Sequence, residues 1–371
     1  MYSQNVRVNN TPYQYRLPLD ITLKFDDVIQ PNDIVMTVVK AVRESDIIRY
    51  VKTDQRDAHG HDSMNMLTAV MLAFTLFGYT SLRQLQDYCA NDARFLLVTG
   101  GMKPSFMSFE RFIHDDLTDS IEDIFCQLNK YIEKEDGRMN TKVLYVDGTK
   151  YEAYAKKTSF VWINGTKRQR AKLWGQIMDH LMKLNKRLQK EKILYQFSIL
   201  HEMSFEYIIK VCNELEKIMK DRNIKVVHGK GSRKHWLQKE REYFRDSAIR
   251  MWKYQLHLDI AGNRNSFSKT DPDATFMHMK YDYYNHTNVF KPGYNVQMGI
   301  SDGYIRAVYV SADPNDMKAY IPFMDKYHRM YGEYPLETPA DAGYGSYDNY
   351  YYCKQNHIQL FLKYPGQEKQ K

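Results

Sequence analysis

The fold of this chain is decided by a stretch near its middle, residues 142–154, which reads KVLYVDGTKYEAY. It opens with a β-branched and aromatic run, Val143 to Val146, and such runs favour buried strands. Asp147-Gly148 interrupts this run, and strand-forming residues resume from Thr149 to Tyr154. We therefore expect a strand that ends at Asp147 and resumes after the glycine. Helical patterns dominate the chain before this point, and strand patterns recur after it.

Strands and helices alternate in the C-terminal part of the chain. Two strand-like runs, 294–300 and 304–310, flank Ser301-Asp302-Gly303, a sequence typical of a hairpin turn. The other elements expected here are a helix over 316–331, a strand over 336–340, a helix over 347–356 and a strand over 358–364. This order predicts a mixed α/β domain over 139–371, in which helices pack on a sheet.

Residues 1–138 are expected to form an all-helical N-terminal domain. Apolar residues recur at three- and four-residue steps from Met66 to Phe77, and Gly78 ends the pattern. Ser81 and Gln84 then have the spacing of a capping box, which predicts the start of a second helix. Two short helices joined by a Gly-Tyr-Thr turn resemble a helix-turn-helix, so we expect this domain to bind DNA.

Positive charge is concentrated in one segment, a helical insertion expected at about 165–260 within the α/β domain. Residues 161–250 carry 21 Lys and Arg against 10 Asp and Glu, whereas the rest of the chain carries 32 against 35. A localised cationic stretch favours a polyanion partner, most often nucleic acid, although a solvated helical face gives the same pattern. The candidate DNA-binding residues are Lys167, Arg168, Arg170, Lys230, Arg233 and Lys234.

Composition excludes several classes of protein. The 371 residues are 43% apolar and 26% charged, which is typical of a folded globular protein. The four cysteines lie far apart without a C-x-x-C pair, which argues against a zinc ribbon, a thioredoxin-like site and a disulfide framework. The longest apolar run, Met66 to Phe77, is shorter than the roughly 20 residues that a bilayer requires. We therefore expect a cytoplasmic protein without a membrane segment.

Two aspartates follow apolar strands, Asp147 after Val-Leu-Tyr-Val and Asp341 after Thr-Pro-Ala. Ligands gather at strand ends in α/β sheets, and a carboxylate pair there suits Mg²⁺ or Mn²⁺, which prefer oxygen ligands. Two such ions would support phosphoryl transfer. The alternative for each residue alone is a turn-forming role, because Asp beside Gly often hydrogen-bonds its own backbone.

Several stretches together resemble the DDE-type transposases of bacterial insertion sequences, in particular the group with an InsH-like helical N-terminal domain. The matching stretches are 78–85 (GYTSLRQL), 97–104 (LVTGGMKP), 108–112 (SFERF), 146–153 (VDGTKYEA), 270–277 (TDPDATFM), 291–297 (KPGYNVQ) and 340–346 (ADAGYGS). The resemblance implies an RNase H-like fold interrupted by an insertion, with metal-dependent cleavage and transfer of DNA strands. It also implies Mg²⁺ or Mn²⁺ as cofactor, with Asp147 as the first and Asp341 as the second acidic residue of the site. A homodimer on the double-stranded terminal repeats of the element, in a bacterial, nucleoid-associated setting, follows from the same resemblance.

The third acidic residue of such enzymes, a glutamate on a later helix, has no counterpart in the sequence. Glu368 lies in a polar tail, Glu152 lies on the first strand, and the tyrosine-arginine-glutamate-lysine signature is absent. We therefore expect a chain truncated before the third acid, weakly active or inactive by itself, with one sheet face partly uncovered.

Two alternatives remain open at this stage. A non-catalytic DNA-binding regulator of an intact transposase would need the helical domain and the cationic insertion but no metal site. An RNase H-like nuclease acting on RNA or hybrids would need the carboxylates, although the helical N-terminus gives it little support. The position of Asp147 relative to Asp341 separates the catalytic hypotheses from the first alternative.

Overall fold

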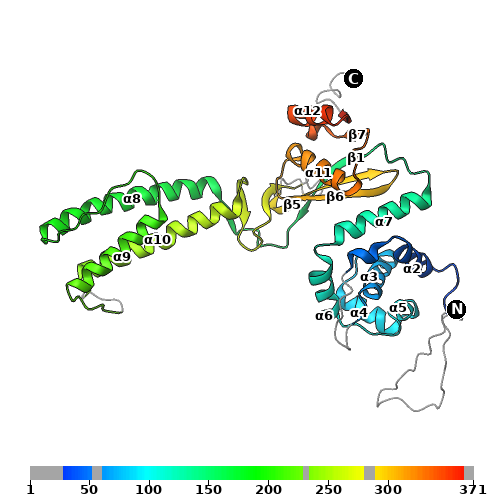
Figure 1. The fold of residues 1–371 in the computed structure, drawn as a ribbon, viewed down its shortest axis with the longest axis horizontal. Helices are drawn as coiled ribbons and strands as arrows, with labels where there is room; N and C mark the ends of the chain where they lie inside the picture. The colour runs from blue at the N-terminus through cyan, green and yellow to red at the C-terminus, as the bar shows by residue number, and fades with distance from the viewer. Residues whose placement is uncertain (1–27, 52–60, 229–233, 280–288, 363–371) are drawn as a thin grey trace, which may run out of the picture.

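The computed structural model describes residues 28–51, 61–228, 234–279 and 289–362. These residues form three parts: an N-terminal helical bundle, a β-sheet with its own helices, and a helical arm that extends away from both (Figure 1). The predicted mixed α/β class is confirmed, because the sheet contains both parallel and antiparallel neighbours.

The bundle is built from short helices around one apolar core that includes Phe95, Phe109 and Phe112, all fully buried. Its elements are α2 (Ile34–Glu44), η1 (Ile47–Tyr50), α3 (Ser63–Phe77), α4 (Leu82–Asn91), α5 (Ala93–Val98), α6 (Phe106–Arg111), the π-helical turn η2 (Phe112–Leu117) and α7 (Ile121–Asp136). The predicted capping box at the start of α4 is confirmed, because Ser81 and Gln84 each bind the other's backbone N–H.

No single helix of the described residues is long and apolar enough to cross a membrane. The neighbours α3 and α4 reach that length and composition only together, and the chain bends by 99° between them.

The last helix of the bundle, α7, is also bound to the sheet. Arg306 of the sheet is buried, and its Nη2 donates a hydrogen bond to Glu133 of α7 at 2.7 Å. A second ion pair joins Lys326 to Glu122, and the thiol of Cys126 donates to a backbone carbonyl of the sheet domain at 2.9 Å. Charged and polar contacts therefore fix the bundle to the sheet.

The main sheet is organised around two neighbouring strands, β1 (Tyr145–Glu152) and β5 (Phe290–Ser301), which run antiparallel. The other edge of β5 pairs with β4 (Thr275–His278) and then with β6 (Tyr304–Ser311). The predicted hairpin between β5 and β6 is confirmed, and Asp302 and Gly303 have positive φ angles of 46° and 84°. The other edge of β1 pairs in parallel with β7 (Glu337–Ala340), which pairs in parallel with β8 (Gln359–Leu362).

Helices cover one face of this sheet. The covering elements are α11 (Asp316–Tyr331), the short 3₁₀ turn η3 (Ala342–Tyr344) and α12 (Tyr347–Gln355). Their core includes Leu144, just before β1, and Val146 of β1, with Tyr320 and Phe323 of α11.

The opposite face of the sheet is open. Tyr145 and Tyr151 share this face of β1, and the two residues are 56% and 55% exposed. Val310 of β6, which lies on the same face through the strand pairing, is 57% exposed.

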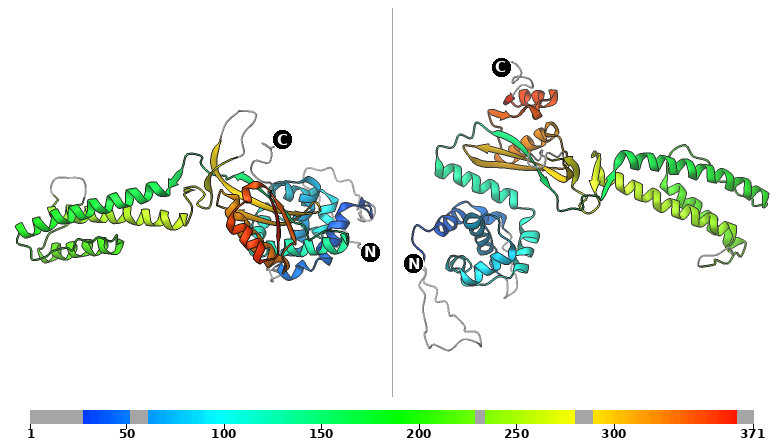
Figure 2. Two further views of the ribbon diagram at one scale, coloured as in Figure 1. Left: turned by 90° about the horizontal axis from the view of Figure 1, so that it is seen from above. Right: turned by 180° about the vertical axis from the view of Figure 1, so that it is seen from behind.

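The arm consists of three helices, α8 (Ile163–Lys190), α9 (Phe205–Asp221) and α10 (Trp236–Ala261). It has an apolar core of its own, with Leu181, Leu215 and Phe244 fully buried. A two-stranded ribbon joins it to the rest of the molecule, made of β2 (Phe160–Trp162) and β3 (Ser266–Ser268). At 1.5 Å per residue α8 is about 40 Å long, so the arm extends well beyond the sheet (Figure 2).

Candidate functional site

The two aspartates singled out by the sequence lie on neighbouring parallel strands. Val146 of β1 pairs with Ala340 of β7, and each aspartate is the next residue along its strand. Asp147 lies inside β1, opposite Met298 of β5, and not at a strand end. The expected break after Asp147 is wrong, because Gly148 continues the antiparallel ladder with β5. Asp341 does follow the end of its strand.

Each of these carboxylates binds a nearby backbone amide. The N–H of Gly148 donates to Asp147 Oδ1 and the N–H of Gly343 donates to Asp341 Oδ1, both at 2.8 Å. The turn-forming role considered for each aspartate is therefore observed. Both residues are also exposed to solvent, and neither forms an ion pair within the described part of the chain. Each carboxylate is oriented by one oxygen, so its second oxygen is accessible to a ligand.

A buried polar network lies beside the two aspartates, on the covered face of the sheet. The side-chain amides of Asn295 and Gln297 donate to Asp316 Oδ1 at 2.7 and 3.0 Å. The hydroxyl of Tyr344 donates to Gln297 Oε1. Asn295, Gln297 and Tyr344 are each 0% exposed. We did not identify these residues as site residues from the sequence, although the alternation of Asn295 and Gln297 inside a strand already placed two amides on one face.

The hydroxyl of Tyr344 lies within the electrostatic influence of three carboxylates. Burial is the largest cause that raises the pKa of Tyr344, and the negative charges of Asp316, Asp147 and Asp341 raise that pKa further. The phenol is therefore neutral and acts as a hydrogen-bond donor. The three aspartates, far apart in the sequence, are neighbours in the fold.

The carboxylate oxygens of Asp147 and Asp341 are the type of ligand that hard divalent cations such as Mg²⁺ prefer. Among the described residues, no three Asp, Glu, His or Cys side chains are placed to hold a metal ion. Mg²⁺, however, keeps several water ligands and is often bound by one or two carboxylates together with substrate phosphates. Asp147 and Asp341 are two solvent-exposed carboxylates that follow paired residues of adjacent strands.

The predicted DNA-binding residues on the arm differ in their surroundings. Lys167 and Arg168, in the first turns of α8, are exposed. Arg170 is half-buried, and its Nε is buried without a hydrogen-bond partner. Lys234 is committed to an ion pair with both carboxylate oxygens of Glu242 at 2.9 Å. Lys230 and Arg233 lie outside the described residues.

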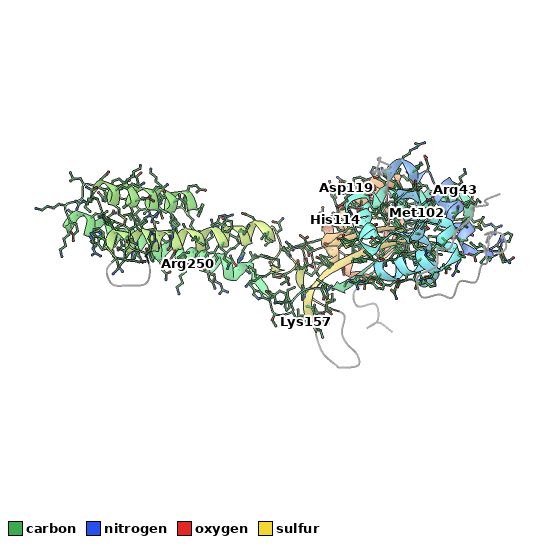
Figure 3. All side chains as sticks on the ribbon, turned by 90° about the horizontal axis from the view of Figure 1, so that it is seen from below. Arg43, Met102, His114, Asp119, Lys157 and Arg250 are labelled. Carbon is green, nitrogen blue, oxygen red and sulfur yellow. The ribbon has the colours of Figure 1, made fainter. Side chains whose placement is uncertain are left out.

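Figure 3 shows the side chains along the arm, with Arg250 on α10 and Lys157 near the junction with the sheet. The predicted positive surface thus depends on Lys167, Arg168 and other exposed cations of the arm. Lys234 contributes less to it, because Glu242 neutralises its charge.

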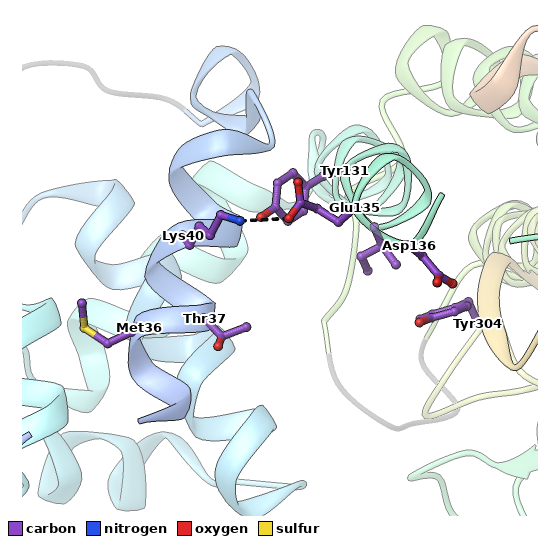
Figure 4. A pocket seen from close by; sticks show the side chains of 8 residues that line it. Met36, Thr37, Lys40, Tyr131, Glu135, Asp136 and Tyr304 are labelled. Carbon is purple, nitrogen blue, oxygen red and sulfur yellow. Dashed lines mark hydrogen bonds and ion pairs between the residues drawn. The ribbon is translucent and has the colours of Figure 1, made fainter. Parts of the chain in front are cut away.

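A hollow on the described surface lies away from these aspartates. It is a cavity of about 550 Å³ between α2, α7 and the start of β6, and the Lys40 to Glu135 ion pair of 2.9 Å crosses it (Figure 4). Neither Asp147 nor Asp341 lines this cavity, which follows the contact between the bundle and the sheet.

Comparison with known proteins identifies the C-terminal part of the chain. Residues 265–370 match the family described as the transposase DDE domain, and this range includes Asp316 and Asp341 but not Asp147. No curated protein and no solved structure matches the chain. The match over residues 265–370 supports a DDE-type transposase, and the DDE domain of such transposases has an RNase H-like fold.

Proposed function

We propose that this transposase cleaves and transfers DNA strands with the help of Mg²⁺ or Mn²⁺ held by Asp147 and Asp341. The observation that carries this proposal is the parallel pairing of Val146 with Ala340, which brings the two aspartates to adjacent strands. Rigid strands are good supports for such groups, because their backbone positions are fixed by the sheet.

Each side chain has a separate task in this proposal. The backbone amides of Gly148 and Gly343 hold one oxygen of Asp147 and of Asp341, so that the other oxygen points to the ligand. A bound divalent cation would activate a water or a DNA hydroxyl and stabilise the departing oxygen. The open sheet face leaves room for a DNA backbone next to Asp147.

The proposed substrate is the double-stranded terminal repeat of an insertion element, bound by a homodimer in the bacterial cytoplasm. Exposed cations of the arm, Lys167 and Arg168 among them, would contact phosphates. The helical bundle would supply a second DNA-binding surface. Contacts with DNA phosphates, whether from the arm or from the bundle, need positive charge on a rigid support and do not depend on one particular arrangement of side chains.

The test is an assay of nicking and joining on terminal-repeat DNA with Mg²⁺ or Mn²⁺. Asp147→Asn and Asp341→Asn keep the shape of each side chain and remove its charge. Each should lower turnover by at least about 100-fold, since a bound cation supplies several kcal/mol of transition-state stabilisation. Asp119→Asn, an exposed aspartate of the bundle, is the matched control and should leave turnover unchanged.

Turnover that survives both substitutions would show that the site is wrongly assigned. Tight DNA binding without any turnover in the wild-type chain would favour the second candidate, a non-catalytic regulator of another transposase. That candidate has one observation in its favour, since no three-residue metal site occurs among the described residues.

The contribution of the arm is tested by the salt dependence of DNA binding. Each phosphate contact contributes about −0.9 to the slope of log affinity against log salt. Charge reversal of Lys167 and Arg168 should therefore make the slope less steep by nearly 2. Lys234→Gln is the control and should change the slope little, because Glu242 already pairs with that lysine. An unchanged slope in the double reversal would remove this part of α8 from the DNA interface.

A further inference from the structure

The buried polar network around Asp316 has no task in the proposed reaction. It joins three separate elements: Asn295 and Gln297 on β5, Asp316 in the first turn of α11, and Tyr344 in η3. The residues around it form an apolar core of Tyr320, Phe323 and others. Buried polar groups reduce stability unless they are fully hydrogen-bonded, so a network at this place calls for an explanation beyond packing.

The carboxylate of Asp316 lies against the backbone next to both aspartates of the site. A Cβ atom added to Gly148 would lie 2.8 Å from Asp316 Oδ1 and 3.1 Å from the hydroxyl of Tyr344. A Cβ atom added to Gly343 would lie 2.9 Å from Asp341 Oδ1 and 3.6 Å from Asp316 Oδ2. Gly148 follows Asp147 directly, and Gly343 donates the backbone hydrogen bond that orients Asp341. Asp316 thus lies close to the two peptide segments whose backbone N–H groups orient the Asp147 and Asp341 carboxylates.

The hydrogen bonds of the network fix Asp316 strongly. Two amide donors converge on one carboxylate oxygen, and bonds to a charged acceptor are shorter and about twice as strong as neutral ones. The negative charge of Asp316 is also favourable at the N-terminus of α11, where backbone amides point outward. Asn295 Oδ1 accepts from the second hydrogen of Gln297 Nε2 at 3.0 Å, so both amides have fixed orientations.

We propose that Asp316 is a positioning residue of the DDE site. Its hydrogen-bonded carboxylate holds the segments at Gly148 and Gly343 in place and thereby sets the directions of Asp147 and Asp341. The hydrogen bond from Tyr344 to Gln297 joins the turn after Asp341 to β5, so it also restricts the movement of that turn. This inference rests on the proposed function, because it assigns Asp147 and Asp341 as the groups that are positioned.

The experiment measures Mn²⁺ binding to the full chain by electron paramagnetic resonance, in parallel with DNA nicking. Asp316→Ala removes the acceptor and should weaken Mn²⁺ binding about tenfold or more, the usual effect of losing a residue that orients metal ligands. Asp316→Asn keeps an oxygen that accepts from both amides, so it should restore most of the Mn²⁺ affinity. Tyr344→Phe removes a single hydroxyl, leaves the fold less perturbed than Asp316→Ala, and should weaken binding in the same direction.

Asp313→Asn is the matched control. Asp313 lies just before α11, pairs with Lys318 at 3.2 Å and does not enter the network, so Mn²⁺ affinity should stay at the wild-type value. Wild-type affinity in both Asp316→Ala and Tyr344→Phe would overturn the proposal. Equal losses in Asp316→Asn and Asp316→Ala would also overturn it, because the charge and not the hydrogen bonds would then matter.

Asp147→Asn and Asp341→Asn separate a failure of this inference from a failure of the proposed function. If neither changes the Mn²⁺ signal, the cation binds elsewhere. The site assignment and the positioning role of Asp316 are then both wrong. If both weaken the signal while Asp316→Ala and Tyr344→Phe do not, only the positioning role is wrong.

Discussion

The two helical regions of this protein, the bundle and the arm, are attached to the sheet in different ways. The bundle is held by α7, whose Glu133 pairs with the buried Arg306 and whose Glu122 pairs with Lys326. The arm is joined through the β2 and β3 ribbon and a small apolar cluster that includes Val161 and Phe267. Side-chain ion pairs therefore connect the bundle to the sheet, whereas a short ribbon and its cluster connect the arm.

This difference predicts two separate unfolding transitions. A region with its own core and few contacts to its neighbour unfolds as a separate cooperative unit. The sequence provides a probe for each region, because all four tryptophans, Trp162, Trp174, Trp236 and Trp252, lie in the arm or at its junction. Tryptophan fluorescence thus follows the arm, and regional hydrogen exchange follows the bundle and the sheet.

The largest effect is expected in the arm core. Phe244→Ala removes a side chain that is 0% exposed and should destabilise the arm by about 4 kcal/mol, through lost burial and the cavity left behind. The fluorescence midpoint in urea should fall, while hydrogen exchange of the bundle and the sheet stays unchanged. Ile249→Ala, a 58% exposed position on the same helix, is the control and should cost at most about 0.5 kcal/mol. A parallel loss of protection in the bundle would show that the arm and the bundle unfold together.

The next largest effect is expected where the bundle meets the sheet. Glu133→Ala leaves the buried guanidinium of Arg306 without its carboxylate, and since the Glu133 side chain is 39% exposed we expect a cost of about 2 kcal/mol, the usual value of a hydrogen bond to a charged group. Hydrogen exchange in α7 and β6 should accelerate, and the fluorescence transition of the arm should not move. Glu135→Ala is the control, since its pair with Lys40 is about half exposed and contributes little to stability. Equal effects of the two variants would mean that Arg306 does not fix the bundle.

A smaller effect is expected within the bundle. Ser81→Ala breaks the capping box of α4 and should cost about 1 kcal/mol, because the backbone N–H of Gln84 loses the hydroxyl that accepts its hydrogen bond. Hydrogen exchange of the first turn of α4 checks this value. Ser120→Ala is the matched control, because Ser120 precedes α7 without capping it through its side chain. A similar loss in both variants would argue against the cap as the cause.

The smallest effect is a pH dependence of the arm. Hydrogen bonds from Lys234 and then from Gln238 lower the pKa of Glu242 below its usual range. A carboxyl with a lower pKa in the folded state contributes stability that is present above its unfolded pKa and is lost as the pH falls through the folded pKa. Fluorescence-detected stability should therefore be level from neutral pH down to the ordinary glutamate pKa and fall below it. Glu242→Gln should reduce that fall by up to about 1 kcal/mol, and an identical acid profile would contradict the assignment.

Local sequence patterns predicted many elements correctly. The capping box at Ser81 and the hairpin turn at Asp302 and Gly303 are both present, since short-range hydrogen bonds and backbone preferences determine them. The helix expected over 316–331 coincides with α11, and the helix expected over 347–356 corresponds to α12. These features depend on neighbours within a few residues, which a sequence pattern records directly.

The candidate site was predicted only in part. The sequence singled out Asp147 and Asp341, but it placed Asp147 at a strand end, and the pairing of Gly148 with β5 makes β1 continuous. It also counted Lys234 among the free cations, and the ion pair with Glu242 was not visible in a charge count. Both differences come from partners that are not neighbours in the sequence, since Gly148 pairs with Gln297 and Lys234 pairs with Glu242, eight residues later.

The sequence by itself determined the class of elements, the cationic character of the arm and the choice of Asp147 and Asp341 as candidate site residues. Only the tertiary structure decided that Asp147 and Asp341 occupy adjacent strands, that Asp316 lies beside both, and that the bundle is tied to the sheet while the arm projects. The physical reason is the separation along the chain between the residues that interact. Helix caps and turns are selected by interactions over a few residues, whereas strand register, buried ion pairs and polar networks join segments that meet only when the whole chain is packed.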